Sequence, residues 1–396
     1  MVGSDFQSLN RKQSHMLRNK FNVVTDGQWG SCGKGAICTA LALKHRPDVI
    51  STTNMANAGH TAVYSDGRSF IAKALPSASI LNKWVDDYNP TIAIGPTAAF
   101  NLKQMQKEVE ICGVENNLVI HPRAGVITDE HQSLESGCSD SSTKHLASTM
   151  QGCGAFLADK VLRKKGLLLA RDYDCLVRYT ASSYNEKVAV LVNSGFSFPY
   201  LDQSKFTILH EGSQGFSLDI SHGSHYPQCT SRSTTAMQNA TDMGINHLNF
   251  GDVYLVIRPY PIRVGNVIED GVEVGNSGGC YSDQHEITWA DVARESGMPA
   301  DIGQSLIQKE LTTVTKRLRR VFTFSFEQLK AAVVLNGATK IALNFANYID
   351  WSCSEMCDFG RLPRKVLEFI DRVEQAAQIP VTIVGTGPQT NHVCFI

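Results

Sequence analysis

Short apolar segments separated by helical patterns constrain the fold of this chain more than any other feature of its sequence. Segments of four to six residues, mostly apolar and without apolar–polar alternation, lie at 21–24, 91–94, 187–192, 206–209, 253–257, 340–343 and 381–384. Strands of this kind are covered by other structure on both faces. Helical patterns lie between several of them, at 35–44, at 97–111 with Thr97 as the cap, and at 361–377. This alternation predicts an α/β fold with a mostly parallel, twisted central sheet flanked by helices.

The domain organisation follows from length and composition. A chain of 396 residues is long enough for two or three domains, or for one large α/β domain. Hydrophobic residues make up 42% and charged residues 19%, a balance typical of a globular protein with a large core. No linker rich in Pro, Gly or Ser divides the sequence. We therefore expect a polar N-terminal extension at 1–20 and one large domain at 21–396.

Charge, hydropathy and cysteine usage argue against several classes of protein. Lys and Arg number 37 and Asp and Glu 38, and the resulting net charge of −1 is not typical of a nucleic-acid-binding protein. No apolar run approaches the roughly 18 residues of a membrane span, and the polar, basic first twenty residues do not resemble a secretory signal. The eleven cysteines are scattered and form no CxxC pair, so we expect reduced thiols in a cytoplasmic protein rather than a zinc site.

A glycine-rich segment, Gly27–Gly35, follows the first predicted strand and precedes the first predicted helix. At such a position, backbone amides and a helix N-terminus bind phosphate oxygens, and Lys34 adds a positive charge for a β- or γ-phosphate. The segment is not a Walker A motif, because five residues rather than four separate Gly27 from Gly33, and Gly35 follows the lysine. A glycine turn with an incidental lysine is the alternative explanation.

A second polar segment, Asn57–Thr61, reads Asn-Ala-Gly-His-Thr. In a loop, these residues could position a nucleotide, offer a carbonyl oxygen to Mg²⁺ and supply an acid. The alternative is that His60 is an ordinary surface histidine.

Together, the two segments closely resemble the signature loops of the adenylosuccinate synthetase family, which couples a 6-oxopurine nucleotide to aspartate at the expense of a nucleoside triphosphate. The similarity continues in order along nearly the whole chain from Phe21. It includes the segments at 148–154, 159–163, 211–215, 218–220, 226–227, 230–235, 263–265, 312–320 and 385–388. The resemblance implies the family's fold, which is related to that of P-loop nucleoside triphosphatases, a Mg²⁺ cofactor, and a homodimer in which Arg163 serves the partner's site.

The resemblance also implies a role for each matching residue. The catalytic positions are Ser31, His60 and Gln214. Triphosphate-binding residues are Gly33, Lys34, Gly35, Gly59, His60, Thr61, Asn347, Gly385, Gly387 and Pro388. Residues that bind the purine monophosphate are Ser31, Asn57, Ser148, Thr149, Arg163, Gln214, Leu218, Thr230 and Val264. Aspartate would be bound by Thr313, Val314, Thr315, Arg317 and Arg319, and Mg²⁺ by Ser31 and the Gly59 carbonyl.

Two positions depart from the usual family pattern. The usual loop reads Gly-Asp-Glu-Gly-Lys-Gly, whereas this chain has Ser31 and Cys32 in place of the two acids. The missing aspartate is the family's base for the N1 proton of the purine, and a serine hydroxyl does not ionise near neutral pH. Asn347 stands where a family aspartate pairs with the guanine of GTP. Because an amide both donates and accepts hydrogen bonds, we expect ATP or dATP rather than strict use of GTP.

A serine at the lost aspartate is the hallmark of one viral branch of the family, the 2-aminoadenylosuccinate synthetases, which act on dGMP for synthesis of DNA containing 2,6-diaminopurine. Guanine differs from hypoxanthine by an amino group at C2, beside N1. A short, neutral Ser31 leaves room for that group and accepts hydrogen bonds from N–H groups. The resemblance therefore implies ligation of L-aspartate to C6 of dGMP through a 6-phosphoryl intermediate, in the host cytoplasm if the chain is viral.

Other hypotheses remain open from the sequence. One is a conventional adenylosuccinate synthetase acting on IMP with GTP, for which the deciding feature is Ser31 against Asp. Another is a non-catalytic nucleotide-binding relative, which the retention of Lys34, His60, Gln214 and Arg317 disfavours. A dinucleotide-dependent oxidoreductase is disfavoured because no GxGxxG motif follows a strand.

Overall fold

The computed structural model describes residues 20–137, 142–180, 206–312 and 317–396. Nine strands of these segments form one large sheet in the spatial order β18-β17-β16-β10-β1-β9-β2-β5-β7. Neighbouring strands are parallel throughout, except that β18 is antiparallel to β17. The strands are β1 (Phe21–Asp26), β2 (Val49–Thr52), β5 (Thr91–Ile94), β7 (Leu118–Ile120), β9 (Ile208–Glu211), β10 (Phe250–Ile257), β16 (Lys340–Leu343), β17 (Val381–Gly385) and β18 (Val393–Phe395).

The order of the strands places a topological switch at β1, near the middle of the sheet. From β1 the chain builds outward on one side through β2, β5 and β7 and returns in β9, directly beside β1. It then crosses to β10 on the other side of β1 and builds outward through β16 and β17. In open α/β sheets, ligands bind beyond the carboxyl ends of the strands at such a point. The fold therefore directs attention to the loops that follow β1, β9 and β10.

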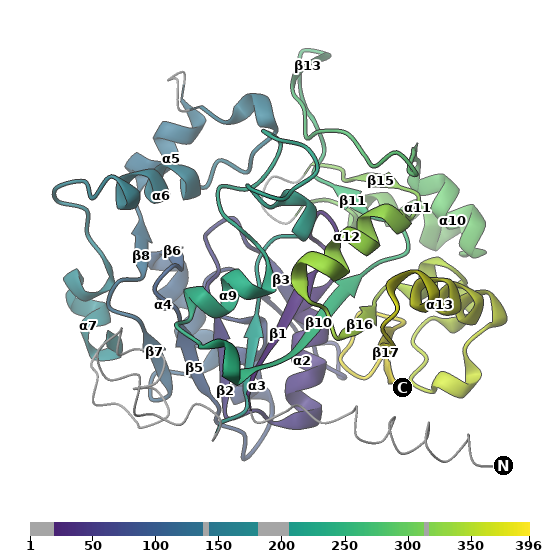
Figure 1. Ribbon diagram of the computed structural model, residues 1–396, viewed down its shortest axis with the longest axis horizontal. Helices are drawn as coiled ribbons and strands as arrows, with labels where there is room; N and C mark the ends of the chain where they lie inside the picture. Colours follow the sequence, from purple (N-terminus) through teal and green to yellow (C-terminus); the bar gives the residue numbers. More distant parts are fainter. Residues whose placement is uncertain (1–19, 138–141, 181–205, 313–316) are drawn as a thin grey trace.

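Helices cover both faces of the sheet, because successive strand residues point to opposite sides. Val24 and Val256 belong to the apolar cluster that packs against α2, α3, α4 and α7, whereas Val23 and Leu255 belong to the cluster that packs against α9, α12 and α13. Figure 1 shows α7 beyond one end of the sheet and α13 at the other. These helices are α2 (Lys34–His45), α3 (Leu81–Trp84), α4 (Leu102–Cys112), α7 (Asp174–Thr180), α9 (Ala236–Asp242), α12 (Phe326–Asn336) and α13 (Arg364–Ala377).

Two smaller apolar clusters lie apart from the main core. One joins α6 to the pair β6–β8 around Phe156, and the other joins α10 and α11 to the sheet β11-β15-β14 around Trp289. In Figure 1, α5 and α6 lie on one side of the molecule and α10 and α11 on the other. The remaining α-helices and strands of the described residues are α5 (Asp129–Ser136), α6 (Cys153–Val161), α10 (Trp289–Ser296), α11 (Ala300–Lys309), β3 (His60–Val63), β4 (Ser69–Ala72), β6 (Ala99–Asn101), β8 (Gly125–Ile127), β11 (Ile262–Arg263), β12 (Val267–Glu269), β13 (Val272–Gly275), β14 (Glu286–Ile287) and β15 (Arg320–Phe322).

The α/β fold with a mostly parallel sheet confirms the sequence prediction. Strands predicted at 91–94 and 340–343 coincide with β5 and β16. Strands β1, β10 and β17 are longer than predicted by one to three residues at one end, and β9 is shifted by two residues. The segment predicted as a strand at 187–192, and all but the last residue of the predicted extension at 1–20, lie outside the described residues.

The helix predicted at 97–111 is wrong at its start. Ala99–Asn101 form β6, which pairs with β8, and α4 begins only at Leu102. The Asn101 side chain caps this helix by accepting a hydrogen bond from the Gln104 amide at 3.1 Å, so strand pairing and a better cap outweigh the Pro-Thr signal. The last helix likewise begins at Arg364 rather than at 361, after Pro363 in an extended conformation.

Two predictions about the whole chain can be compared with the described residues. Ten cysteines fall within them, and all ten are free thiols. Across the same residues, no helix has the length and apolar character needed to cross a lipid bilayer.

Candidate active site

One large cavity of ≈790 Å³ lies beyond the carboxyl ends of the central strands. Loops after β1, β2, β9, β10, β16 and β17 all contribute to its lining. Eighteen of the residues predicted from the sequence line it: Ser31, Gly33, Lys34, Gly35, Asn57, Gly59, His60, Thr61, Ser148, Thr149, Gln214, Leu218, Thr230, Val264, Arg319, Asn347, Gly387 and Pro388. The fold thus gathers residues from ten short stretches of sequence into a single site at the topological switch.

The glycine-rich loop after β1 is organised around the buried carboxylate of Asp26. Oδ1 accepts hydrogen bonds from the amides of Gln28 (2.9 Å) and Gly30 (3.1 Å), and Oδ2 accepts one from the Cys32 amide (3.0 Å). These three amides are used within the loop and are not available to a ligand. The result is a tight loop in which Ser31, with a φ of 57°, is exposed and lines the cavity.

The amides that can meet a phosphate are those that follow. Helix α2 begins at Lys34, and Gly33, with a φ of 84°, precedes it without any side-chain cap. No described residue accepts a hydrogen bond from the amides of residues 33–36, which carry the partial positive charge of a helix N-terminus. Gly33 packs closely against the Asn344 side chain, and a Cβ there would overlap it. The glycines therefore leave the backbone at this helix N-terminus open to a ligand, an arrangement that binds phosphate groups in other proteins.

Lys34 ties this loop to the loop that follows β9. Its Nζ lies 3.2 Å from Asp26 Oδ2 and donates to the Gln214 carbonyl at 2.7 Å. Only 3% of Lys34 is exposed, yet it lines the cavity. The ammonium group is therefore held in a fixed position between the two loops before any ligand binds.

His60 forms a pair with Glu211, the last residue of β9. The His60 Nδ1 is in direct contact with Glu211 Oε1, while Glu211 Oε2 accepts from the Ser77 amide (2.8 Å) and hydroxyl (2.6 Å). Burial acts to raise the pKa of Glu211, but His60 and the Ser77 donors outweigh it and bring that pKa below its usual value. The carboxylate thus stays ionised and fixes the imidazole, leaving its other nitrogen for a ligand.

A second buried carboxylate organises the predicted monophosphate loop. Glu135, at the end of α5, accepts hydrogen bonds from the amides of Gly152 (2.8 Å) and Gly154 (2.6 Å) at the start of α6. Ser148 and Thr149 immediately precede this turn and line the cavity. Glu135 therefore holds the turn that presents their polar groups.

A cluster of charges closes the side of the cavity near α11. Arg258, which follows β10, donates to the Ser31 carbonyl (3.3 Å) and to Glu310 (3.3 Å). Glu310 also accepts from Arg319 (3.2 Å) and from the Tyr348 hydroxyl (2.9 Å). Burial lowers the pKa of Arg319 from its usual value. Glu310 thus orients two arginines, one against the glycine-rich loop and one in the predicted aspartate site.

The loop after β16 carries Asn347, which is 7% exposed and lines the cavity. None of the described residues forms a hydrogen bond with its side-chain amide, so the amide can pair with a ligand. Nearby, Asn344 donates to the Cys32 carbonyl at 3.2 Å and links this loop to the glycine-rich loop.

Some predicted residues do not reach the cavity. Arg317 donates to the carbonyls of Gly265 (3.0 Å), Ala147 (2.8 Å) and Ser148 (3.0 Å), so it braces the monophosphate loop. Gly385 ends β17, is buried and is not among the lining residues. Arg163 is exposed, outside the lining. Thr313, Val314 and Thr315 lie outside the described residues.

The sequence analysis overlooked several residues that organise the site. Asp26 carried a usable signal, because it is a carboxylate between a strand and a glycine-rich loop. Glu211 lay within a quoted segment but was given no role. Arg258, Glu135 and Glu310 carried no local signal, because their importance depends on contacts with residues distant in sequence.

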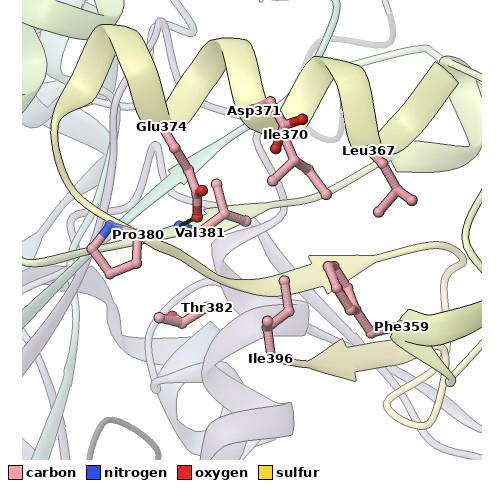
Figure 2. Close-up of a pocket in the computed structure, with 9 residues that line it drawn as sticks. All are labelled: Phe359, Leu367, Ile370, Asp371, Glu374, Pro380, Val381, Thr382 and Ile396. Carbon is pink, nitrogen blue, oxygen red and sulfur yellow. Dashed lines mark hydrogen bonds between the residues drawn. The ribbon is translucent and has the colours of Figure 1, made fainter. Parts of the chain in front are cut away.

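A second hollow, of ≈340 Å³, lies between α13 and the pair β17–β18 (Figure 2). Its lining is largely apolar, and Glu374 uses one carboxylate oxygen to accept the Val381 amide at 2.8 Å. The residues described there include no Lys, Arg or His, and none of the predicted site residues. The larger cavity is therefore the site that suits an anionic ligand.

Amides without an acceptor among the described residues at a helix N-terminus, a fixed lysine and an oriented histidine occupy the switch point of a parallel sheet. This fold and this site define a nucleotide-dependent enzyme that handles phosphoryl groups. Comparison with known proteins gives the family.

The sequence profile of the family described as adenylosuccinate synthetase matches residues 23–192 and 179–351. An N6-succino-2-amino-2'-deoxyadenylate synthase of Salmonella phage PMBT28 is 32% identical, covering 94% of this chain and 97% of the relative. The adenylosuccinate synthetase of Thermococcus onnurineus (strain NA1) is also 32% identical, with the same coverage. The chain belongs to the adenylosuccinate synthetase family and is a carbon–nitrogen ligase.

A solved structure supports the same assignment. The succinoaminodeoxyadenylate synthetase of cyanophage S-2L, bound to dGMP and to dATP as an energy donor, superposes with a TM-score of 0.74 at 30% identity, over 96% of this chain and 95% of that chain. Overall identity does not separate the phage enzyme from the archaeal one, so the substrate must be argued from individual residues.

Proposed function

We propose that this chain joins L-aspartate to C6 of dGMP, with ATP or dATP as phosphoryl donor, to give N6-succino-2-amino-2'-deoxyadenylate for synthesis of DNA containing 2,6-diaminopurine. The observation that carries this proposal is Ser31, a short neutral side chain exposed in the cavity at the position of the family's catalytic acid. Relatives named for this product are similar over nearly the whole chain, and the cyanophage structure was solved with dGMP and dATP.

The carboxylates of the cavity support the same choice. Among the described lining residues, these are Glu135 and Glu310. The first accepts the amides at the start of α6, and the second accepts two arginines and a tyrosine hydroxyl. Both are committed to structural hydrogen bonds, so neither is free to replace the lost aspartate as base. We infer that the N1 proton of the purine leaves to water near Ser31.

The donor site is built from the loop after β1 and the loop before β3. The amides of residues 33–36 and the Lys34 ammonium bind the phosphates, and His60, oriented by Glu211, stabilises the developing charge on the leaving oxygen. Asn347 pairs with adenine, since an amide matches the donor and acceptor of that base.

Mg²⁺ fits the oxygen groups at this point of the cavity. The described residues contain no cluster of three or more His, Cys, Asp or Glu that could hold a metal. Ser31 and the Gly59 carbonyl offer two oxygen ligands, and Mg²⁺ usually completes its shell with water and substrate phosphates. When bound, the ion offsets the charge of the transferring phosphoryl group.

The acceptor nucleotide occupies the opposite part of the cavity. Asn57, Ser148, Thr149 and Thr230 hold its phosphate, and Gln214 orients its base, with Leu218 and Val264 against it. Thr313, Val314, Thr315, Arg317 and Arg319 would grip the carboxylates of aspartate, as the family resemblance implies. Arginine suits this task because its planar fork matches a carboxylate.

The reaction proceeds in two steps. The purine O6 attacks the γ-phosphorus, the bond between that phosphorus and the β,γ-bridging oxygen breaks, and ADP or dADP leaves. The aspartate amine then attacks C6, the C6–O6 bond breaks, and phosphate leaves while the amine proton passes to solvent. Holding both nucleotides and aspartate in one cavity makes each step effectively unimolecular.

The proposal includes a homodimer. Arg163 follows α6 and is exposed beside Val161 (73%) and Leu162 (75%), an apolar pair of the kind found at subunit contacts. In the dimer, Arg163 would reach the acceptor phosphate of the partner's site. Replacement of Arg163 by Ala should leave a folded protein with a raised KM for the purine monophosphate, and light scattering should report a dimer.

A phosphate-release assay tests the proposal directly. Purified protein, Mg²⁺ and aspartate are combined with dGMP, GMP, dIMP or IMP, each with ATP, dATP or GTP. Turnover of dGMP with ATP or dATP is the expected result. Turnover of IMP with GTP alone would show that the chain is a conventional adenylosuccinate synthetase. Nucleotide binding without turnover would show that it is a non-catalytic relative.

A further inference from the structure

The carboxylate of Asp26 holds the backbone on both sides of Ser31, the residue on which the proposed function depends. We call these two hydrogen bonds the bracket on Ser31. Asp26 is the last residue of β1, is 0% exposed and is not among the residues that line the cavity. It accepts the amide of Gly30 on one oxygen and the amide of Cys32 on the other, so it binds the two residues on either side of Ser31. The loop cannot turn Ser31 away from the cavity without breaking one of these hydrogen bonds.

The backbone conformation of Ser31 shows why such a bracket is needed. Its φ of 57° lies in the left-handed region, which is sterically unfavourable for a residue with a Cβ. Such a conformation persists when its surroundings hold it on both sides. Asp26 supplies that restraint through the flanking amides, and Arg258 adds a bond to the Ser31 carbonyl.

The same carboxylate also places the phosphate-binding lysine. Oδ2 of Asp26 lies 3.2 Å from Lys34 Nζ, which in turn donates to the Gln214 carbonyl at 2.7 Å. Lys34 would otherwise sample several rotamers of a long, flexible side chain. One buried group therefore orients the residue beside the purine, the residue beside the triphosphate and, through Lys34, the loop that carries Gln214.

We propose that Asp26 is a positioning residue of the ligation reaction. By fixing Ser31 and Lys34 together, it holds the purine monophosphate and the nucleoside triphosphate in the geometry in which they react. It does not line the cavity, and both of its oxygens are occupied by fixed donors, so it is not the missing base. The inference rests on the proposed function for the roles of Ser31 and Lys34.

Asparagine is the sharpest replacement for Asp26. It has nearly the same shape but only one acceptor oxygen, and its amide group would face either the Gly30 side or the Cys32 and Lys34 side with a donor. One half of the bracket is lost whichever way the side chain turns. The chain also offers a matched control, Asp252→Asn, because Asp252 forms a buried pair with Lys340 at 3.1 Å near the amino ends of β10 and β16.

The experiment measures kcat, the KM for each substrate, the ratio of turnover on dGMP to turnover on IMP, and the thermal midpoint of the full-length protein and both variants. Asp26→Asn should lower kcat by about 30-fold, raise the KM for ATP and change the substrate ratio, since positioning errors act on the reacting geometry. Asp252→Asn should lower the thermal midpoint with kcat within about 2-fold of the parent. A kcat for Asp26→Asn within about 2-fold of the parent, or an equal loss in both variants, would overturn the proposal.

A second pair of variants covers the case in which Asp26→Asn does not fold. The double variant Asp26→Asn/Lys34→Met replaces the whole ion pair with neutral groups of similar size, a change that folded proteins often tolerate. Its kcat should lie about 5-fold or more below that of Lys34→Met alone, because the bracket on Ser31 is also lost. Equal kcat values would contradict the proposal. All rates are measured on the monophosphate that the parent turns over best, so a parent that prefers IMP refutes the proposed substrate without deciding the role of Asp26.

Discussion

Two buried ion pairs, each formed by an aspartate and a lysine, lie at opposite ends of the central parallel strands. We call these two ends the carboxyl edge and the amino edge of the sheet. Asp26 and Lys34 meet at the carboxyl end of β1, where Nζ and Oδ2 are 3.2 Å apart, and Asp252 and Lys340 meet near the amino ends of β10 and β16, where they are 3.1 Å apart. The first carboxylate also accepts three loop amides, and its lysine lines a cavity. The second accepts the Thr339 hydroxyl and joins two neighbouring strands.

The difference shows that position in the fold, rather than the ion pair itself, makes a functional site. Buried pairs contribute little net stability, because desolvation offsets most of the attraction. At the amino edge, the pair lies between two neighbouring strands, and neither residue lines the cavity. At the carboxyl edge, the same chemistry lies beneath a loop and a helix N-terminus, and it orders groups that meet a ligand.

The largest expected effect separates the two lysines. Lys34→Met should lower kcat about 1,000-fold, because it removes a fixed positive charge from the transferring phosphates. Lys340→Met, the matched change at the other edge, should leave kcat within about 2-fold of the parent. Steady-state phosphate release for both variants checks this, and equal losses would erase the distinction between the two edges.

A smaller effect is expected at another buried pair, His60 with Glu211, which also lies at the carboxyl edge. His60→Asn should lower kcat about 100-fold with little change in the KM for dGMP, since the imidazole acts on the leaving oxygen. Glu211→Gln should lower kcat by less, because the His60 imidazole remains and only its orientation becomes less fixed. Full activity in His60→Asn would show that the carboxyl edge does not act as one unit.

Ser31→Asp sharpens the comparison at the residue that Asp26 brackets. The variant restores an ionisable base beside N1 and adds charge and bulk near the C2 position. The ratio of turnover on IMP to turnover on dGMP should rise about 10-fold. Ser31→Ala is the control for loss of the hydroxyl alone, and an unchanged ratio in Ser31→Asp would contradict our account of this position.

Asp252→Asn should affect stability and not turnover. Removal of one partner leaves Lys340 buried without its carboxylate, at a cost of about 3 kcal/mol in the free energy of unfolding. Urea unfolding measures the loss, and phosphate release at saturating substrate should match the parent. A large fall in kcat for the folded variant would show that the amino edge contributes to the site.

The smallest effect concerns His210, the neighbour of Glu211 on β9. Burial lowers the pKa of His210 to about 3, and its ring is held by Ser51 (3.0 Å) and Asn239 (3.2 Å). In the unfolded chain a histidine binds a proton near pH 6.5, so stability falls as the pH drops below that value, by on the order of 2 kcal/mol at pH 5. His210→Gln should flatten the fall in unfolding free energy between pH 7 and pH 5, and an unaltered pH dependence would rule out this origin.

The sequence predicts the strands and many residues that line the cavity, because both depend on short local patterns of residues. Buried strands read as short apolar runs, and the glycine-rich loop and the Asn57–Thr61 segment are compact motifs. The start of α4 was wrong because Ala99 pairs with β8 across a distance the local pattern does not encode. Glu310 and Arg258 were missed for the same reason, since each gains its role from partners far away in the chain.

Arg317 shows a different limit of sequence reasoning. Its motif places it in the aspartate site, but in the described structure it donates to three backbone carbonyls that brace the monophosphate loop. The residues immediately before it, 313–316, lie outside the described part of the chain. Its proposed role with aspartate therefore rests on the family pattern.

A competition experiment tests the central claim most directly. The protein is given equal concentrations of dGMP and IMP with excess aspartate, ATP and Mg²⁺, and the two succinyl nucleotides are quantified by mass spectrometry at low conversion. The account predicts that N6-succino-2-amino-2'-deoxyadenylate is the dominant product, and that Ser31→Asp moves the product ratio towards adenylosuccinate. Adenylosuccinate as the dominant product of the parent would contradict it.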